Sequence, residues 1–434
     1  MRWRLPRRAC EPFFKQLQQT FAAGGAQAPP VLFCSPKHFR YDDVLLMTTN
    51  LLHVQLAITP GAEIPDAGIL IRDGEIEAIG PRESMTLPGG ASEITSTDKV
   101  ALPGFVDVHI HGAGGHDVME GSAEALSAVA RTVARHGTTS FVATTVTASP
   151  DDTCRSVEGI ASYISQQFQT DEARAEVLGL HFEGPFISAA RPGVHPLEWI
   201  KLPSADLLEK FLKCAAGHAQ ILTIAPELLG AMPCIDAARK AGLVVAMGHT
   251  DATYEQARLG ISHGARHAVH VYNAMRPFTH RDSGVIGAVL TTPEVSAELI
   301  ADGVHVDEAA MRLLLQAKGA ERVILVSDGI SATGMPDGKY ALGKLEVTVS
   351  GGVCRNADGK LAGSTLTLDR ALRNIVALGT PLADAVRMVT LNPASLLGIE
   401  LKKGALRRGA DADIVLLNEA LQVTNVWARG TNVN

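Results

Sequence analysis

The chain has 434 residues, of which 46% are hydrophobic and 20% charged, as in ordinary soluble globular proteins. Its 39 basic and 46 acidic side chains give a formal net charge of −7, which excludes a strongly basic surface for nucleic acid or anionic lipid. No apolar run reaches membrane-spanning length. We therefore expect no nucleic-acid or membrane partner, and a core that can serve one to three domains.

The first 43 residues differ in composition from the rest. Residues 1–30 carry five basic side chains against one acid and then run into Gly, Ala and Pro. Basic, acid-poor ends are typical of targeting peptides, but Gln16, Gln18 and Gln19 interrupt the apolar stretch. We favour a disordered extension over residues 1–43.

The next segment and the last one have the alternating pattern of short strands. Residues 44–103 contain VLLMTTNLLHVQ, AGILIRDGEIEAIG and KVALPG, with Asp73-Gly74 as a hairpin-turn signal. Residues 405–434 return to this pattern in IVLLNEALQVTNVWARG. We expect one small β-sandwich domain built from both segments.

Residues 104–404 repeat a unit of short apolar run, polar tip and amphipathic helical stretch. The eight runs predict a parallel (β/α)₈ TIM-like barrel, with chemistry at the carboxyl ends of its strands. A doubly wound sheet is the alternative, but the glycines at 112, 114 and 115 make a poor phosphate loop. The runs are FVDVHIH, TSFVATTV, VLGLHFEGP, ILTIAPE, LVVAMGHT, HAVHVYNAM, SAELIADG and RVILVSDG.

Glu183 ends one of these apolar runs, directly before Gly184 and Pro185. A buried carboxylate is costly unless a positive charge lies against it. Four other strand ends also carry imidazoles or carboxylates, the ligands that zinc and iron(II) prefer. We therefore expect a metal site at the barrel mouth, formed from His109, His111, Glu183, His249, His270 and Asp328.

Each of these residues has an ordinary explanation when it is considered alone. A single histidine near a strand end is more often a packed core residue than a ligand, and we expect this of His136, His218, His263 and His267. Asp before Gly, as at Asp328, is a common turn former. The coincidence of five strand ends favours the metal site. There Asp328 is well placed to take a proton from water and to return it to a leaving group.

Six cysteines are scattered without a C-x-x-C pair, and we expect single reduced thiols of a cytosolic protein. They are Cys10, Cys34, Cys154, Cys214, Cys234 and Cys354.

Longer motifs resemble the amidohydrolase superfamily, and within it the deacetylases of N-acetylated amino-sugar phosphates. The resemblance covers nearly everything after residue 44, and it implies the barrel and the β-sandwich domain described above. The motifs are PGFVDVHIHG, LGLHFEGPF, GVHP, TIAPE, GHTDAT, HVYNAMRPFTHRDSG, ADGVHVD, VSDG and LAGSTLTL.

The resemblance also implies roles at the metal centre. Glu183, His249 and His270 match the metal ligands, Asp328 the catalytic acid and base, and His195 the residue that polarises the scissile carbonyl. Members differ at the first strand, and because His109 and His111 are both present we expect a second metal bridged by Glu183. A single metal with an unused histidine pair is the alternative. We expect zinc, with iron, cobalt or manganese as alternatives.

Other matched positions imply contacts with the sugar phosphate. Arg281 matches a phosphate ligand that can come from the neighbouring subunit, and Ala362 stands where a serine is common. The matched positions are Val194, Asn273, Ala274, Arg281, His305, Ala362, Gly363 and Ser364.

The implied activity is hydrolysis of N-acetylglucosamine-6-phosphate to glucosamine-6-phosphate and acetate, by a cytoplasmic homodimer or homotetramer. The galactosamine epimer is an alternative substrate. A dihydroorotase-like or deaminase activity is disfavoured because many of these enzymes bridge two metals with a lysine on the fourth strand, where ILTIAPE has none. A non-catalytic barrel used for binding or assembly is a further alternative, but such a protein would be expected to have lost ligands.

Overall fold

The computed structural model describes residues 49–169 and 172–433. Contacts divide the chain into two units, residues 1–46 and 47–434, and the first lies outside the described residues. The prediction of disorder for residues 1–43 therefore concerns a segment outside the described residues. No helix in the described part is long and apolar enough to cross a membrane.

Eight parallel strands form the central sheet, and each corresponds to one of the eight predicted runs. Their backbone hydrogen bonds connect neighbours in chain order, so the predicted (β/α)₈ TIM-like barrel is confirmed. The strands are β5 (Phe105–Ile110), β8 (Thr138–Thr145), β9 (Glu176–Glu183), β10 (Ala219–Ile224), β11 (Val244–Met247), β12 (His267–Ala268), β13 (Ser296–Leu299) and β14 (Val323–Leu325).

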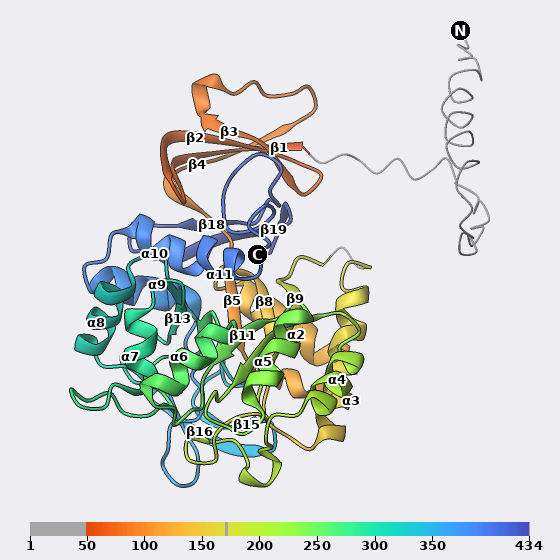
Figure 1. Ribbon diagram of the computed structural model, residues 1–434. Coiled ribbons are helices and arrows are strands. Elements are labelled where there is room, and N and C mark those ends of the chain that lie inside the picture. Colours follow the sequence, from red (N-terminus) through yellow and green to blue (C-terminus); the bar gives the residue numbers. More distant parts are fainter. Residues whose placement is uncertain (1–48, 170–171, 434) are drawn as a thin grey trace, which may run out of the picture. The chain divides into compact units, whose positions relative to one another are not determined.

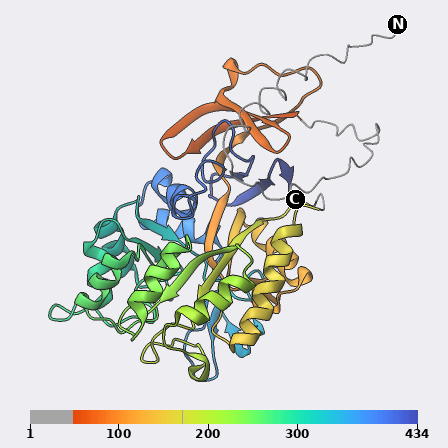
Figure 2. The same ribbon diagram turned by 45° about the vertical axis from the view of Figure 1, so that its right-hand side comes forward.

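One helix follows each barrel strand; the helices labelled in Figure 1 lie around the strands, and Figure 2 shows the same arrangement turned by 45°. Their apolar faces pack on the strands, as in α2, where Leu126, Val129 and Val133 are buried. The eight helices are α2 (Ala123–Ala134), α3 (Pro150–Gln166), α4 (Ala205–Cys214), α5 (Ala231–Lys240), α6 (Tyr254–His263), α7 (Gly284–Thr291), α8 (Glu308–Lys318) and α9 (Leu368–Ala377). The helices α10 (Leu382–Val389) and α11 (Leu391–Leu396) and the short turns η1 (Arg82–Ser84), η2 (Val118–Glu120) and η3 (Leu197–Trp199) complete the set.

The barrel closes between the first and last strands at their carboxyl ends. The backbone N–H of Asp328 donates to the carbonyl of His109 over 2.9 Å, and that of His111 donates to Gly329 over 2.8 Å. The segment after β14 therefore lies against the end of β5. This pairing brings Asp328 beside the first-strand histidines although about 220 residues separate them.

Both ends of the described chain contribute to a seven-stranded sheet in the order β20-β19-β18-β4-β1-β2-β3. Asp73 and Gly74 have φ of 51° and 83°, as a two-residue hairpin turn between β2 and β3 requires. A small sheet domain from both termini is thus confirmed, whereas the predicted boundaries 44–103, 104–404 and 405–434 stay a prediction. The strands are β1 (Thr49–Thr59), β2 (Ala62–Arg72), β3 (Glu75–Pro81), β4 (Ser92–Pro103), β18 (Ile414–Leu417), β19 (Val423–Ala428) and β20 (Thr431–Asn432).

A three-stranded antiparallel sheet follows β14 and borders the barrel mouth. It consists of β15 (Gly338–Leu342), β16 (Leu345–Ser350) and β17 (Val353–Arg355), and a short hairpin, β6 (Gly112–Ala113) with β7 (His116–Asp117), follows β5. Apolar side chains of this sheet pack with Val146, Ile330 and Ala362 in a cluster of their own. The sheet therefore supplies Leu342 as an apolar wall of the cavity described below.

Cys154 in α3 and Cys214 at the end of α4 form a disulfide, with their Cα atoms 5.5 Å apart. The expectation of single reduced thiols is therefore wrong for this pair. The two cysteines are 60 residues apart in sequence, and the packing of α3 against α4 brings them together. The expectation holds for Cys234 and Cys354, which are free and buried, and Cys10 and Cys34 lie outside the described residues.

Candidate active site

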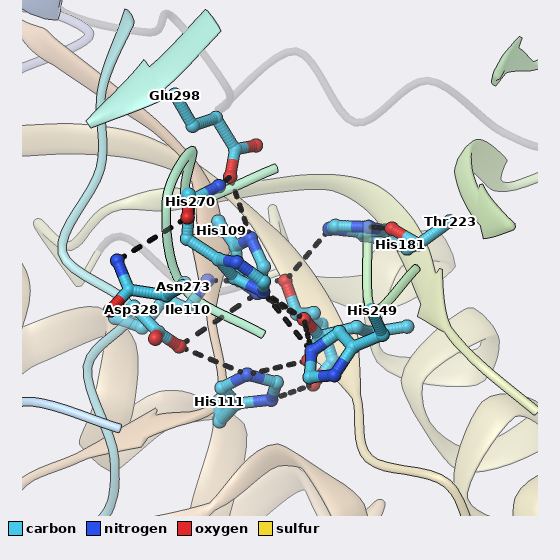
Figure 3. A network of polar contacts seen from close by, with 12 residues as sticks. His109, Ile110, His111, His181, Thr223, His249, His270, Asn273, Glu298 and Asp328 are labelled. Atoms are coloured by element: carbon cyan, nitrogen blue, oxygen red, sulfur yellow. Dashed lines mark hydrogen bonds and ion pairs between the residues drawn. The ribbon is translucent and has the colours of Figure 1, made fainter. Parts of the chain in front are cut away.

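Glu183 lies at the centre of the barrel mouth, at the end of β9, with 2% of its surface exposed. Five histidine Nε2 atoms surround its two carboxylate oxygens at 2.9 to 3.4 Å. Four of these rings are labelled in Figure 3, where they converge from the ends of β5, β11 and β12. The buried charge that the sequence left unexplained is therefore enclosed by imidazoles. They belong to His109, His111, His195, His249 and His270.

Three of the residues predicted for the metal site hold left-handed backbone conformations. His249, His270 and Asp328 have φ of 46°, 28° and 48°. A non-glycine residue in this region costs on the order of 1 kcal/mol or more and persists where its surroundings require it. They lie two or three residues beyond the ends of β11, β12 and β14, and their side chains all line the cavity at the mouth.

The outer nitrogens of three rings are occupied by hydrogen-bond acceptors. Nδ1 of His109 lies 2.9 Å from the carboxylate of Glu298, Nδ1 of His111 lies 3.0 Å from the carbonyl of Thr144, and Nδ1 of His249 lies 3.1 Å from the carbonyl of Arg191. A carbonyl or carboxylate oxygen only accepts, so each neutral ring carries its proton on Nδ1. Each therefore presents a lone pair on Nε2.

The Nε2 lone pairs lie close to carboxylate oxygens and to one another, and such close contacts show whether the site would accommodate a metal ion. Nε2 of His249 lies 3.1 Å from Oε1 of Glu183 and 3.1 Å from Nε2 of His270, and Nε2 of His111 lies 3.2 Å from both Glu183 and Asp328. Acceptor atoms this close repel one another unless a proton or a metal ion lies between them. Imidazole nitrogens and carboxylate oxygens that converge in a buried site are a typical donor set for zinc or iron(II).

Without a metal ion, only protons on the rings can offset the repulsion between these acceptor atoms. Burial opposes the charge of His111, yet hydrogen bonds to Asp328 and Glu183 raise its pKa to about 9. For Glu183 burial also opposes the charge, but the neighbouring His109 and the hydrogen bonds from the rings hold its pKa well below the usual range. Burial lowers the pKa of His249 to about 4, so this ring is neutral at physiological pH. The surroundings of Glu183 therefore keep its carboxylate charged and place positive charge beside it.

His195 is oriented differently from the other rings. The backbone N–H of Thr147 donates to its Nδ1 over 3.2 Å, while its Nε2 lies 3.4 Å from Glu183. Asp328 is 9% exposed and reaches His111 with Oδ1. The ring of His195 and the carboxylate of Asp328 thus border the same cavity as Glu183.

A cavity of about 220 Å³ opens over Glu183. Its wall includes five positions that the sequence assigned to the sugar phosphate, together with the apolar side chains of Val146, Leu342 and Leu361. Nδ1 of His305 is held at 2.7 Å by Asp302, which leaves the other ring nitrogen for a ligand. The five are Val194, Asn273, Ala274, His305 and Gly363.

Three predicted contact residues do not line this cavity in a single chain. Arg281 is exposed and borders a separate hollow with Tyr254 and Glu255, and the neighbouring Asp282 pairs with Arg276 instead. Ala362 is buried in the apolar cluster of the three-stranded sheet. The hydroxyl of Ser364 donates to the carbonyl of Ser327, so it is already used within the fold.

Residues 100–433 match the amidohydrolase family over more than half of the chain. The chain belongs to this family. The predicted membership is confirmed, and the amidohydrolase barrel accounts for the position of the site at the carboxyl ends of the strands.

Named relatives of this amidohydrolase are deacetylases. The N-acetylglucosamine-6-phosphate deacetylase of Lysinibacillus sphaericus is 38% identical, over 81% of this chain and 89% of the relative. The N-acetylgalactosamine-6-phosphate deacetylase of Escherichia coli O157:H7 is 36% identical, over 88% and 98%. A solved N-acetyl-D-glucosamine-6-phosphate deacetylase variant from Mycobacterium smegmatis, in complex with N-acetyl-D-glucosamine-6-phosphate, superimposes with a TM-score of 0.82 at 35% identity, over 89% and 99%.

Residues that the sequence analysis missed form the base of the amidohydrolase site. One carboxylate oxygen of Glu298 contacts His109, and the other lies 2.8 Å from Nε2 of His267. From the sequence alone we expect His267 to be an ordinary packed histidine. His181 is also buried beside this group: burial lowers its pKa to about 3, and its Nε2 lies 2.8 Å from the hydroxyl of Thr223. The signal for Glu298 was present, because it is a carboxylate inside the apolar run SAELIA.

Proposed function

We propose that this amidohydrolase removes the acetyl group of N-acetylglucosamine-6-phosphate, giving glucosamine-6-phosphate and acetate in amino-sugar catabolism or recycling. The observation that carries the proposal is the cavity over the buried carboxylate of Glu183, which His195 and Asp328 both line. The names of the relatives at 35–38% identity support the same reaction.

Glu183, His249 and His270 would hold one divalent metal ion, and His109 and His111 would hold a second that shares Glu183. When bound, such an ion supplies Lewis acidity and lowers the pKa of coordinated water to about 7. Zinc is the expected ion because the donors are nitrogen and carboxylate oxygen, and iron(II), cobalt and manganese suit the same set.

The side chains would then divide the proton transfers of amide hydrolysis between them. Asp328 takes a proton from the attacking water and delivers it to the departing nitrogen of the sugar. His195 donates its Nε2–H to the acetyl oxygen, where negative charge develops in the transition state. Deep burial strengthens both interactions, because the site excludes most water.

The sugar phosphate would lie along the wall formed by Val194, Asn273, Ala274, His305 and Gly363. The main chain of Val194 and the amide of Asn273 would hold sugar and phosphate oxygens, and His305 a sugar hydroxyl. We propose that Arg281 reaches the phosphate of a neighbouring subunit in a homodimer or homotetramer, since its guanidinium can bind phosphate in bidentate fashion and it does not line its own chain's cavity.

The galactosamine epimer is the second candidate substrate, because the Escherichia coli O157:H7 relative is an N-acetylgalactosamine-6-phosphate deacetylase that matches over almost its whole length. The decisive experiment measures acetate release from both epimers with purified protein, together with its metal content. We expect faster turnover of the glucosamine form and one or two ions per chain. Metal-loaded protein that hydrolyses neither epimer would contradict the proposal.

A cytoplasmic location would suit this substrate, because sugar phosphates are charged and do not cross membranes freely. The disulfide between Cys154 and Cys214 is unusual for that compartment. Counting free thiols in protein from gently lysed, alkylated cells tests the location. Two reactive thiols at these positions agree with a reducing compartment, and none argues against it.

A further inference from the structure

Glu298 is a fully buried carboxylate on β13 that the proposed reaction does not use. One of its oxygens lies 2.9 Å from Nδ1 of His109 and 3.0 Å from the backbone N–H of His270. Its other oxygen lies 2.8 Å from Nε2 of His267. Figure 3 shows Glu298 on the opposite side of His109 from His111.

This contact determines which nitrogen of His109 faces the cavity. An anionic carboxylate accepts but cannot donate, so it keeps the proton of His109 on Nδ1. The lone pair of Nε2 is then directed toward Glu183, 3.3 Å away, where it makes no hydrogen bond within the described residues. A buried nitrogen without a partner that points at a carboxylate has the geometry of a metal ligand.

Of the two first-strand histidines, only His109 depends on Glu298 for the position of its ring proton. The neighbouring His111 places its Nδ1 on the carbonyl of Thr144 in the backbone of β8, and that acceptor remains whatever residue stands at 298. The same oxygen that holds His109 also holds the backbone of His270, whose φ of 28° is strained. Glu298 therefore connects ligands of both expected metal positions, and His109 depends on it most.

We propose that Glu298 is the positioning residue that makes the first-strand histidine pair a functional second metal site. The carboxylate orients His109 and increases the basicity of its Nε2, as outer partners of metal-bound histidines do. This inference rests on the proposed function, because it requires a first ion at Glu183, His249 and His270.

The test compares wild-type protein with Glu298→Gln, which keeps the shape of the side chain and removes its charge. Both are purified with bound metal, analysed for zinc per chain and titrated with a zinc chelator. We expect two ions in the wild type and one in the variant, with the second site about 10- to 100-fold weaker. Acetate release should lose kcat with little change in KM, because the sugar wall is untouched.

Two further variants separate positioning from stability. Glu176→Gln removes a carboxylate from β9 where it pairs with Lys403 at 2.8 Å, outside the site, and should retain both ions whatever its effect on melting temperature. His109→Gln should lose the second ion. Adding Glu298→Gln to it should weaken metal binding no further, because both changes remove the same ligand.

Two tightly held ions in a folded Glu298→Gln protein would overturn the inference and leave the proposed function standing. A single ion in the wild type would also overturn it. A wild type that binds no metal and shows no activity would overturn the proposed function as well. If Glu298→Gln does not fold, Glu298→Asp decides in its place, because the shorter carboxylate retreats from His109. Wild-type affinity for both ions in that variant would overturn the inference.

Discussion

The backbone N–H of Thr147 donates to Nδ1 of His195 over 3.2 Å, and this donation distinguishes His195 from its neighbours; the hydroxyl of Thr147 lies 2.8 Å from the same nitrogen. Because Nδ1 accepts, the neutral ring carries its proton on Nε2, which faces Glu183. His109, His111 and His249 have the opposite arrangement and present lone pairs. The centre thus contains rings suited to metal binding and one suited to donating a hydrogen bond.

His195→Phe should therefore lower kcat for acetate release about 10²- to 10³-fold, the usual effect of removing one donor to a developing oxyanion. Its metal content should stay at the wild-type level. The measurements are steady-state kinetics and metal analysis of one sample. Loss of metal together with activity would show that His195 is a ligand, as its place beside Glu183 and His249 would also permit.

Asp328→Asn should reduce acetate release by at least about 10²-fold, because an amide cannot take the proton of the attacking water. Metal content should remain unchanged, since Glu183 and the four histidines proposed as ligands are intact. Metal analysis is informative here because Asp328 also lies within reach of His109 and His111 as a potential ligand. Turnover at the wild-type rate would remove Asp328 from the proposed mechanism.

Arg281→Ala should raise KM for N-acetylglucosamine-6-phosphate at least about tenfold and leave hydrolysis of free N-acetylglucosamine nearly unchanged, because only the first carries a phosphate. The exposed Arg408→Ala is the control for loss of a positive charge. Equal effects on both substrates would contradict phosphate binding.

Mixing Arg281→Ala protein with the nearly inactive Asp328→Asn protein, at a substrate concentration well below KM, tests where Arg281 acts. If it serves a neighbouring subunit, Arg281→Ala chains assembled with Asp328→Asn chains should recover activity, since each mixed pair contains one complete site. No recovery in verified mixed oligomers would place the function of Arg281 in its own chain.

Cys154→Ser should lower the free energy of unfolding under oxidising conditions by about 3–4 kcal/mol, the range for a disulfide that closes a loop of this length. Under reducing conditions wild type and variant should be nearly equal. Urea unfolding with and without reductant measures both. Cys234→Ser, at a free buried thiol, is the control: it keeps the disulfide and should depend on reductant as the wild type does.

Lys318 predicts a pH dependence of stability. Burial lowers its pKa to about 8, while its ammonium donates to the carbonyls of Val289 and Thr292 at the end of α7. The folded state therefore binds fewer protons than the unfolded state between pH 8 and the ordinary value of 10.5. Below pH 8 the buried Lys318 ammonium lowers the free energy of unfolding by its full desolvation cost. This cost disappears as the pH rises from 8 to 10.5.

Wild type should accordingly gain stability relative to Lys318→Met between pH 8 and pH 10.5. Urea unfolding of both proteins at pH 7.5, 9 and 10.5 measures the difference, which removes the titration of all other groups. A difference that is constant with pH would show that Lys318 titrates normally in the folded protein.

The sequence by itself determined the barrel and most of the residues at its mouth. Alternation along a strand is a local property, so His109 with His111, and His181 with Glu183, had to share a face wherever the strands lay. Eight apolar runs separated by helical segments predict a parallel barrel, whose strand ends meet at one rim. For this reason Glu183, His249, His270 and Asp328 could be grouped before any coordinates were known.

Only the tertiary structure decided how these residues are used. Which ring nitrogen carries the proton depends on partners distant in sequence, such as Glu298, which lies 189 positions from His109. The pairing of Cys154 with Cys214 and the separation of Arg281 from its own chain's cavity likewise follow from packing between elements. Hydrogen bonds and disulfides act over a few ångströms in space, and local sequence patterns carry no information about such distances.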